Sequence, residues 1–201
     1  MKRKIRIGFD FDGVIAYNPL RFARLPVSLL GELLFGKRDK VVTYCPKTKV
    51  EELFWIVLHE TSFFPASGFG ELKSLLENGT IEGYLLTSRY ACLEKSFYKW
   101  LKKYGIDKKF SGYFLNKENE KPHMFKERMI RKLELDYYID DNWGIVEYLV
   151  EKGKSKKDGF KTQIHWIYNF LERGNPYQHK HPHLSKFLER ILQADSLNRT
   201  I

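Results

Sequence analysis

Residues 4–14 read K-I-R-I-G-F-D-F-D-G-V. Over residues 4–9, apolar side chains alternate with basic residues and a glycine, which predicts a β-strand with one apolar face. The apolar pattern stops at Asp10 and Asp12, and Gly13 follows. In an open α/β sheet, ligands bind outside the carboxyl ends of the strands. This stretch therefore predicts a strand that carries functional carboxylates at its end.

Strand and helix patterns alternate along much of the remaining chain. Further strands are predicted at 81–86, 112–115 and 136–139, and helices at 70–77, 89–104 and 122–133. Strands that alternate with helices of about 10–15 residues indicate a parallel sheet between two helical layers. The predicted fold class is therefore α/β, with a three-layer α/β/α, Rossmann-like core.

Residues 15–65 have a different texture. They contain an apolar stretch at 25–35, a turn-rich patch at 36–40 and an aromatic run at 50–59. We interpret them as a small helical cap inserted after the first strand, and assign 1–14 and 66–201 to the core. Four aromatic residues of the cap could line a substrate pocket, although core packing is the commoner role: Phe54, Trp55, Phe63 and Phe64.

Polar side chains follow three of the predicted strands: Asp10 with Asp12, Thr87 with Ser88, and Asp140 with Asp141. Parallel strands bring these ends to one edge of the sheet. Four crowded carboxylates repel one another unless a cation lies among them. An all-oxygen ligand set favours Mg²⁺, which usually pairs with a substrate phosphate. One carboxylate can then attack phosphorus, and a second can protonate the leaving oxygen and later activate water.

This combination resembles the haloacid dehalogenase-like hydrolases, which are mostly phosphatases that work through an aspartyl-phosphate. Their D-x-D-G-V motif after a buried strand matches residues 10–14 in full. Their Thr or Ser at the end of a hydrophobic strand matches Thr87, and their later acidic pair matches Asp140 and Asp141. The order of the motifs also agrees, and the matching pieces span residues 4–150.

The resemblance implies a role for each matching residue. Asp10 would be the nucleophile and a metal ligand. Asp12 would be the general acid and base, and its backbone carbonyl would bind Mg²⁺. Thr87 would hold a phosphoryl oxygen, and Asp141, with Asp140 close by, would complete the metal site.

The resemblance also implies a lysine that neutralises the nucleophile and the phosphate. Lys126, early on the helix before the acidic strand, is the favoured candidate. Lys121 is its rival, and could otherwise bind substrate; Lys117 is a poorer candidate. Ser88 and Arg89 are further substrate-binding candidates, although a solvated arginine is an equally good interpretation of Arg89.

Each motif taken alone has an ordinary structural interpretation. The pair Asp10 and Asp12 could lie in a solvated turn, whereas Asp140-Asp141 and Thr87-Ser88 could cap the helices that follow them. Their joint occurrence in this order favours a phosphoryl-transfer site.

Two further patterns lie near the end of the chain. His179, His181 and His183 lack the Cys or acidic partners of a zinc site, so we interpret them as a surface loop. The alternating aromatics at 166–170 suit either a packed strand, which we favour, or a nucleic-acid surface.

Composition limits the classes of function. The chain has 201 residues, 43% of them hydrophobic, which excludes a disordered chain. It has 35 Lys and Arg against 25 Asp and Glu, a net charge of +10, which suggests an anionic partner. The acids at 10 and 12 interrupt any signal-peptide pattern, and no apolar run is long enough for a membrane span. With two cysteines, Cys45 and Cys92, a reducing compartment and a cytoplasmic location are expected.

The sequence therefore predicts a Mg²⁺-dependent phosphatase for a small phosphomonoester. Residues 64–79 and the 139–141 ending resemble the 5′(3′)-deoxyribonucleotidase branch of the family, which suggests a nucleotide substrate. Two alternatives stay open. One is a phosphatase for nucleic-acid phosphate ends, because residues 151–201 carry 10 basic against 5 acidic residues. The other is a non-catalytic module that binds phosphate or nucleic acid.

Overall fold

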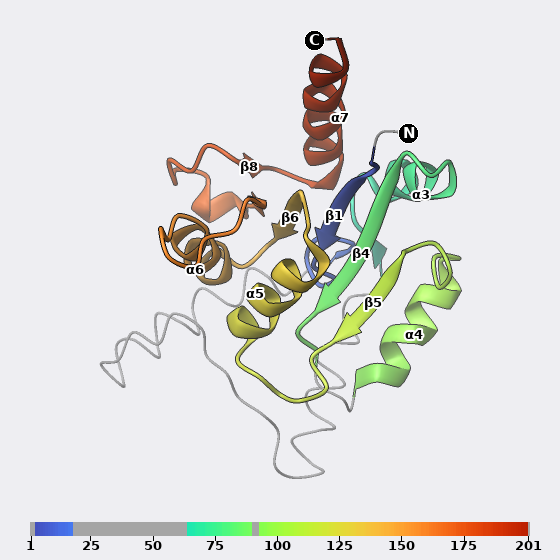
Figure 1. Cartoon of the computed structure of the whole chain (residues 1–201). Helices are drawn as coiled ribbons and strands as arrows, with labels where there is room; N and C mark the ends of the chain where they lie inside the picture. The colour runs from blue at the N-terminus through green and yellow to red at the C-terminus, as the bar shows by residue number, and fades with distance from the viewer. Residues whose placement is uncertain (1–2, 18–63, 90–92, 201) are drawn as a thin grey trace.

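The structure, a computed structural model, describes residues 3–17, 64–89 and 93–200. Its main element is a six-stranded sheet in the order β5-β4-β1-β6-β7-β8, in which all neighbouring strands are parallel (Figure 1). The strands are β1 (Ile5–Phe9), β4 (Ile81–Thr87), β5 (Gly112–Leu115), β6 (Tyr137–Asp140), β7 (Gln163–Ile167) and β8 (Lys180–His181). The parallel α/β sheet predicted from the sequence is confirmed.

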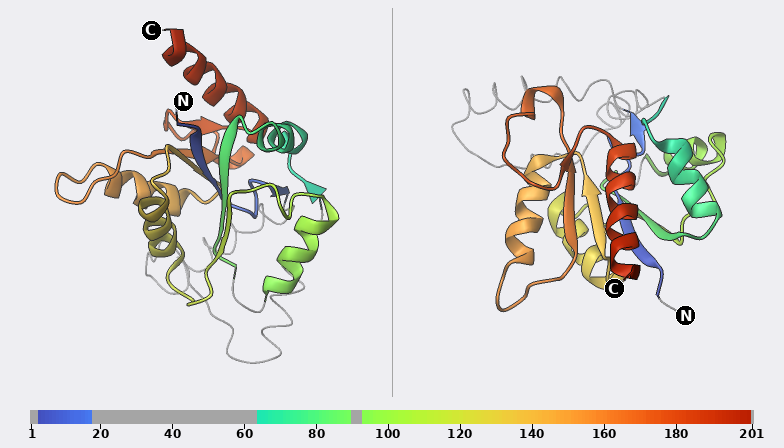
Figure 2. Two further views of the ribbon diagram at one scale, coloured as in Figure 1. Left: turned by 45° about the vertical axis from the view of Figure 1, so that its right-hand side comes forward. Right: turned by 90° about the horizontal axis from the view of Figure 1, so that it is seen from above.

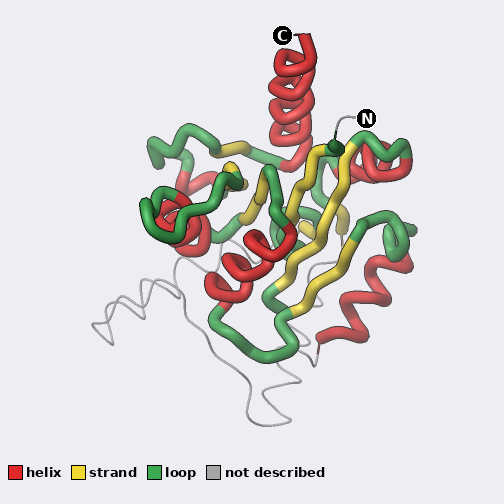
Figure 3. Tube along the Cα trace, in the orientation of Figure 1, coloured by secondary structure: helices red, strands yellow, loops and turns green. Residues whose placement is uncertain are grey.

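Helices cover both faces of this sheet and give the predicted three layers (Figures 2 and 3). They are α3 (Phe69–Glu77), α4 (Glu94–Lys103), α5 (Pro122–Leu133), α6 (Trp143–Gly153) and α7 (Leu184–Thr200). Buried side chains of α3, α4 and α7 share one hydrophobic cluster, and those of α5 and α6 share a second cluster on the other face.

Strand β1 lies between these two clusters, because its large apolar side chains alternate with other residues along the strand. Ile5, Ile7 and Phe9 all face the cluster of α3, α4 and α7. On the opposite face, a Cβ at Gly8 would lie 2.5 Å from Leu135 Cδ1 and 2.9 Å from Tyr138 Cδ2. The glycine therefore allows close packing on the second face.

The order of the strands determines where a ligand can bind. From β1 the chain builds β4 and then β5 on one side, and it later returns to β6 on the other side. The strand order thus reverses at β1, and such a switch point is the usual ligand site of an open α/β sheet. The carboxyl ends of β4, β1 and β6 lie next to one another at this point.

Element boundaries agree with most of the predictions. The helix predicted at 122–133 has the observed bounds of α5. Helix α4, however, begins at Glu94, and Arg89 is not helical, so the predicted start at 89 is wrong. The last fifty residues contain β7, a short 3₁₀ helix η3 (Phe170–Glu172), β8 and α7.

A small antiparallel ladder joins the two sides of the predicted cap. Strand β2 (Ala16–Tyr17) pairs with β3 (Phe64–Pro65), so Tyr17 lies opposite Phe64. Ala16 is still buried in the core cluster. Phe64 is 66% exposed, so the core interpretation is wrong for this aromatic residue.

Most of the predicted cap lies outside the described residues. Residues 18–63 are not described, and they include Phe54, Trp55, Phe63 and Cys45. Cys92, in the segment assigned to the core, also lies outside the described residues. The division into a core and a cap therefore stays a prediction. Among the described residues, no helix is both long and apolar enough to cross a membrane.

Candidate active site

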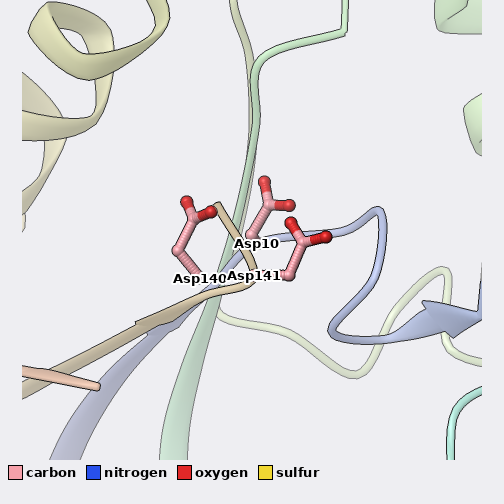
Figure 4. A group of neighbouring side chains, drawn as sticks. All are labelled: Asp10, Asp140 and Asp141. Carbon is pink, nitrogen blue, oxygen red and sulfur yellow. The ribbon is translucent and has the colours of Figure 1, made fainter. Parts of the chain in front are cut away.

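Three aspartates from two neighbouring strand ends meet at the switch point (Figure 4). Asp10 follows β1, and Asp140 and Asp141 lie at the end of β6. The Asp10 N–H donates to the Ile139 carbonyl over 3.0 Å, which joins the two strand ends. Each aspartate is buried, and each offers an oxygen within 4.8 Å of the others. The sequence therefore correctly predicted that the carboxylates of β1 and β6 come together.

The residues around the acidic pair orient it. Tyr138 Oη donates to Asp140 Oδ2 over 2.6 Å, and the Asn142 N–H donates to Asp140 Oδ1 over 2.9 Å. Asn142, not an aspartate, caps α6 by accepting from the N–H groups of Gly144 and Ile145. The interpretation of Asp140 and Asp141 as helix caps is therefore wrong. Sequence reasoning missed Tyr138, whose position in an apolar strand gave no sign of this contact.

Lys126 supplies a buried positive charge to the cluster. Its ammonium donates to Asp10 Oδ1 and, over 2.5 Å, to the Leu86 carbonyl. It also lies 3.7 Å from Asp140 Oδ2, and its side chain is fully buried. The first turns of α5 place it there because Phe125 and Met129 anchor the same helix in the core.

The two rival lysines lie elsewhere. Lys121 is the exposed residue that precedes the first turn of α5. Lys117 forms an ion pair with Glu94 over 2.6 Å on the surface. Of the three candidate lysines, the structure thus places Lys126 against the aspartates.

Burial determines the proton affinity of this cluster. It raises the pKa of Asp10 well above its ordinary value, because the charged carboxylate loses its hydration. Lys126 opposes this rise in the pKa, whereas the charges of Asp140 and Asp141 add to it. Burial, followed by the charge of Asp140, likewise raises the pKa of Tyr138 well above its ordinary value, so its hydroxyl stays a hydrogen-bond donor.

Thr87 and Ser88 lie at the end of β4, beside the end of β1. Thr87 is buried, and its Oγ1 accepts from the Arg89 N–H over 3.2 Å. Ser88 Oγ is also buried and has no hydrogen-bond partner among the described residues. Leu93 occupies the capping position of α4, so the interpretation of Thr87-Ser88 as a helix cap is wrong.

Asp12 and Arg89 form a second buried ion pair. Arg89 Nε donates to Asp12 Oδ2 and Nη2 to Asp12 Oδ1, both over 2.8 Å. Both residues are less than a tenth exposed. The interpretations of Asp12 as part of a solvated turn and of Arg89 as a solvated arginine are therefore wrong.

The donor set suits a hard divalent cation. Three carboxylates within reach of one another provide the oxygen ligands that Mg²⁺ prefers. Gly13, with φ of +85°, makes room for them, because a Cβ there would lie 2.2 Å from Asp141 Oδ2. Among the described residues, no other group of three acidic, His or Cys side chains converges in this way.

One of the three histidines predicted to lie in a surface loop, His181, does not lie in one. His181 is buried in β8, and its Nε2 lies 2.8 Å from His165 Nδ1 of β7. The pairing of β7 with β8 brings His165 and His181 together and buries the His181 ring. The aromatic alternation was interpreted correctly as a packed strand, since Trp166 is fully buried, although Phe170 is exposed.

No protein-family model and no curated protein matches the sequence, but solved structures match the fold. YfnB of Bacillus subtilis, described as a HAD-hydrolase bound to magnesium, has a TM-score of 0.56 and 16% identity over 95% of this chain and 99% of its own. CbbY of Rhodobacter sphaeroides in complex with phosphate has a TM-score of 0.54 and 12% identity, and the match covers 92% of this chain and 96% of its own. A haloacid dehalogenase-like family hydrolase of Xanthomonas campestris has a TM-score of 0.53 and 11% identity, and the match covers 98% of this chain and 99% of its own.

The chain has the haloacid dehalogenase-like fold. The resemblance based on residues 10–14, Thr87 and the acidic pair thus predicted the fold correctly. In this haloacid dehalogenase-like core, the buried aspartates lie at the switch point of the parallel sheet.

Proposed function

We propose that this protein is a Mg²⁺-dependent phosphatase that hydrolyses a small phosphomonoester through an aspartyl-phosphate on Asp10. The observation that supports it most is the buried cluster of Asp10, Asp140 and Asp141 with the Lys126 ammonium. A carboxylate nucleophile, a cation site and a fixed positive charge then converge at one point of a haloacid dehalogenase-like fold. Solvated turns or helix caps would not bury these charges together.

In the first step, an Asp10 carboxylate oxygen attacks phosphorus and the bond to the leaving oxygen breaks. Asp12 gives a proton to that oxygen, so the alcohol leaves neutral. The Lys126 ammonium, already bonded to Asp10 Oδ1, balances negative charge on the nucleophile and on the phosphoryl group. The hydroxyls of Thr87 and Ser88 supply donors for phosphoryl oxygens, and the buried Ser88 Oγ, which has no partner among the described residues, suits this role.

In the second step, the Asp12 carboxylate takes a proton from water as the water attacks the aspartyl-phosphate. Phosphate departs and Asp10 is regenerated. Asp10, Asp140 and Asp141, with the Asp12 carbonyl, would hold Mg²⁺. The bound ion would offset the repulsion of the carboxylates and polarise the phosphoryl group.

The distribution of basic residues supports a small substrate. A lysine-rich loop at 154–161 follows the end of α6, and α6 runs away from the active-site edge. The start of β7, which follows this loop, pairs with the start of β6. These charges therefore lie at the amino edge of the sheet, opposite the aspartates, and do not extend the site for a polymer. A nucleotide substrate and a cytoplasmic location stay predictions from the sequence.

The proposal is tested by phosphate release from 4-nitrophenyl phosphate, with and without Mg²⁺. We expect Mg²⁺-dependent turnover that Asp10→Asn lowers by about a thousandfold or more. Asp158→Asn, on the exposed loop at the opposite edge, is the matched control. Full activity of Asp10→Asn would contradict the nucleophile, and phosphate binding without turnover would favour the non-catalytic module. Faster turnover of an end-phosphorylated oligonucleotide than of a mononucleotide would favour the polymer substrate.

A further inference from the structure

The pair of Arg89 and Asp12 is a feature that the reaction above does not require. A lone carboxylate at residue 12 could exchange protons without a buried guanidinium on both of its oxygens. Both partners are almost fully buried, so solvent does not screen the contact, and the fork contains two bonds of 2.8 Å. Such two-point contacts fix the direction of a carboxylate as well as its position.

Arg89 is itself held firmly. Its backbone N–H donates to Thr87 Oγ1, and its guanidinium lies over the Phe11 ring, 4.6 Å from the ring centroid. Phe11 in turn packs edge-on against Phe97 and Trp100, each with a centroid distance of 5.0 Å. The end of β4 and the aromatic core of α4 thus determine where the Asp12 carboxylate lies.

The two buried cations contact different carboxylates of the site. Lys126 contacts Asp10 and Asp140, whereas Arg89 contacts Asp12. Arg89 therefore keeps Asp12 apart from the aspartates that would hold the metal.

We propose that Arg89 is the positioning residue of the general acid and base Asp12; this rests on the proposed phosphatase function. The guanidinium fork contacts both Asp12 oxygens and so fixes the plane and direction of the carboxyl group. In its protonated form Asp12 passes that proton to the leaving oxygen while the phosphorus–oxygen bond breaks and Asp10 bonds to phosphorus, and Asp12 is left as the carboxylate that faces Arg89. Lysine could keep the charge but not the fork, because an ammonium is a point donor.

The leaving group separates this role from a merely structural one. A nitrophenolate departs without a proton, whereas an unsubstituted phenoxide is more basic and depends on the acid. We therefore measure kcat/KM for 4-nitrophenyl phosphate and phenyl phosphate, which differ little in shape. Arg89→Lys should lower the value for phenyl phosphate by about tenfold or more and that for the nitrophenyl ester by less than about threefold. Arg128→Lys, in an exposed pair with Glu120, is the control and should lower neither.

Asp12→Asn removes the general acid and base itself, and so gives the largest loss on phenyl phosphate that Arg89 could cause by acting through Asp12. If Arg89 acts through Asp12, adding Arg89→Lys to Asp12→Asn should cost nothing more on phenyl phosphate. Equal losses on both esters, or additive losses in the double variant, would overturn the role of Arg89 while the phosphatase stands. If the wild type releases phosphate from neither ester, the proposed function itself fails. Circular dichroism of each variant excludes loss of folding, and Arg89→Gln serves if Arg89→Lys does not fold.

Discussion

Two of the clusters of buried polar side chains in the described part of this molecule differ in how their charges are balanced. At the switch point, three aspartates lie together, and the Lys126 ammonium contacts two of them, Asp10 and Asp140. Between β7 and β8, His165 and His181 form a hydrogen-bonded pair. Burial lowers the pKa of His165 to about 2 and that of His181 to about 4, so both rings stay neutral.

The difference separates a site from a structural contact. The histidine pair is satisfied internally, because His165 Nε2 lies 2.9 Å from Gln163 Oε1 and Phe187 packs against both rings. In the aspartate cluster, burial raises the pKa of Asp10 well above normal, and the neighbouring charges of Asp140 and Asp141 add to this rise. An unbalanced buried cluster costs stability unless a ligand completes it. We therefore expect ligands to affect the first cluster and pH to affect the second.

The largest expected effect is the loss of activity on removal of the Lys126 charge. Lys126→Met keeps the apolar stem but leaves Asp10 and Asp140 without their ammonium. We expect kcat on 4-nitrophenyl phosphate to fall by about a hundredfold or more, since fixed charges at a reacting phosphate contribute on this scale. Lys121→Met, at the exposed position that precedes the same helix, should lower it by less than about threefold. A larger loss at residue 121 would reverse this assignment.

A smaller effect is stabilisation by Mg²⁺. The ion should relieve the repulsion of the aspartates and bind only the folded chain. At a hundredfold excess over its dissociation constant it would contribute about 2.7 kcal/mol, or a rise in Tm of roughly 5–10 °C. Differential scanning calorimetry with and without Mg²⁺ measures this shift. Asp141→Asn should abolish most of it, and an unchanged shift in that variant would show that the ion binds elsewhere.

The smallest expected effect concerns the histidine pair. The unfolded chain binds protons on these rings below pH 6.5, whereas the folded chain does not until pH falls to about 4 at His181 and about 2 at His165. The stability from this pair is therefore complete above pH 6.5 and is lost progressively as pH falls. We expect the Tm of the wild type to fall more between pH 6.5 and 4 than that of the double variant His165→Gln/His181→Gln. Equal falls would show that the rings are not held neutral, and activity should not differ at pH 7.

The same contrast explains what the sequence could predict. Asp10, Thr87 and Asp140 end strands whose apolar patterns are clear, and parallel strands bring their ends to one edge without further information. Lys126 was the favoured lysine because it lies early on a recognisable helix. These residues depend on local pattern and on the fold, so the structure brings them together as predicted, although their catalytic roles stay predictions.

The sequence could not predict the contacts that depend on the direction of a side chain. Nothing in the order of residues indicates that Arg89 turns toward Asp12, because this requires the position of the Phe11 ring. The burial of His181 likewise depends on the pairing of β7 with β8, which brings His165 within 2.8 Å. In the sequence alone, a histidine with a distant partner cannot be distinguished from an exposed loop residue.

The central claim is that Asp10 carries the phosphoryl group during turnover. The most direct test is rapid acid quenching of the protein during turnover of a phosphomonoester with Mg²⁺, followed by mass spectrometry of its peptides. We predict a phosphoryl adduct on the peptide that contains Asp10, with loss of the adduct on hydroxylamine treatment and none in Asp10→Asn. Turnover with no adduct at Asp10, or with one at another residue, would contradict the claim.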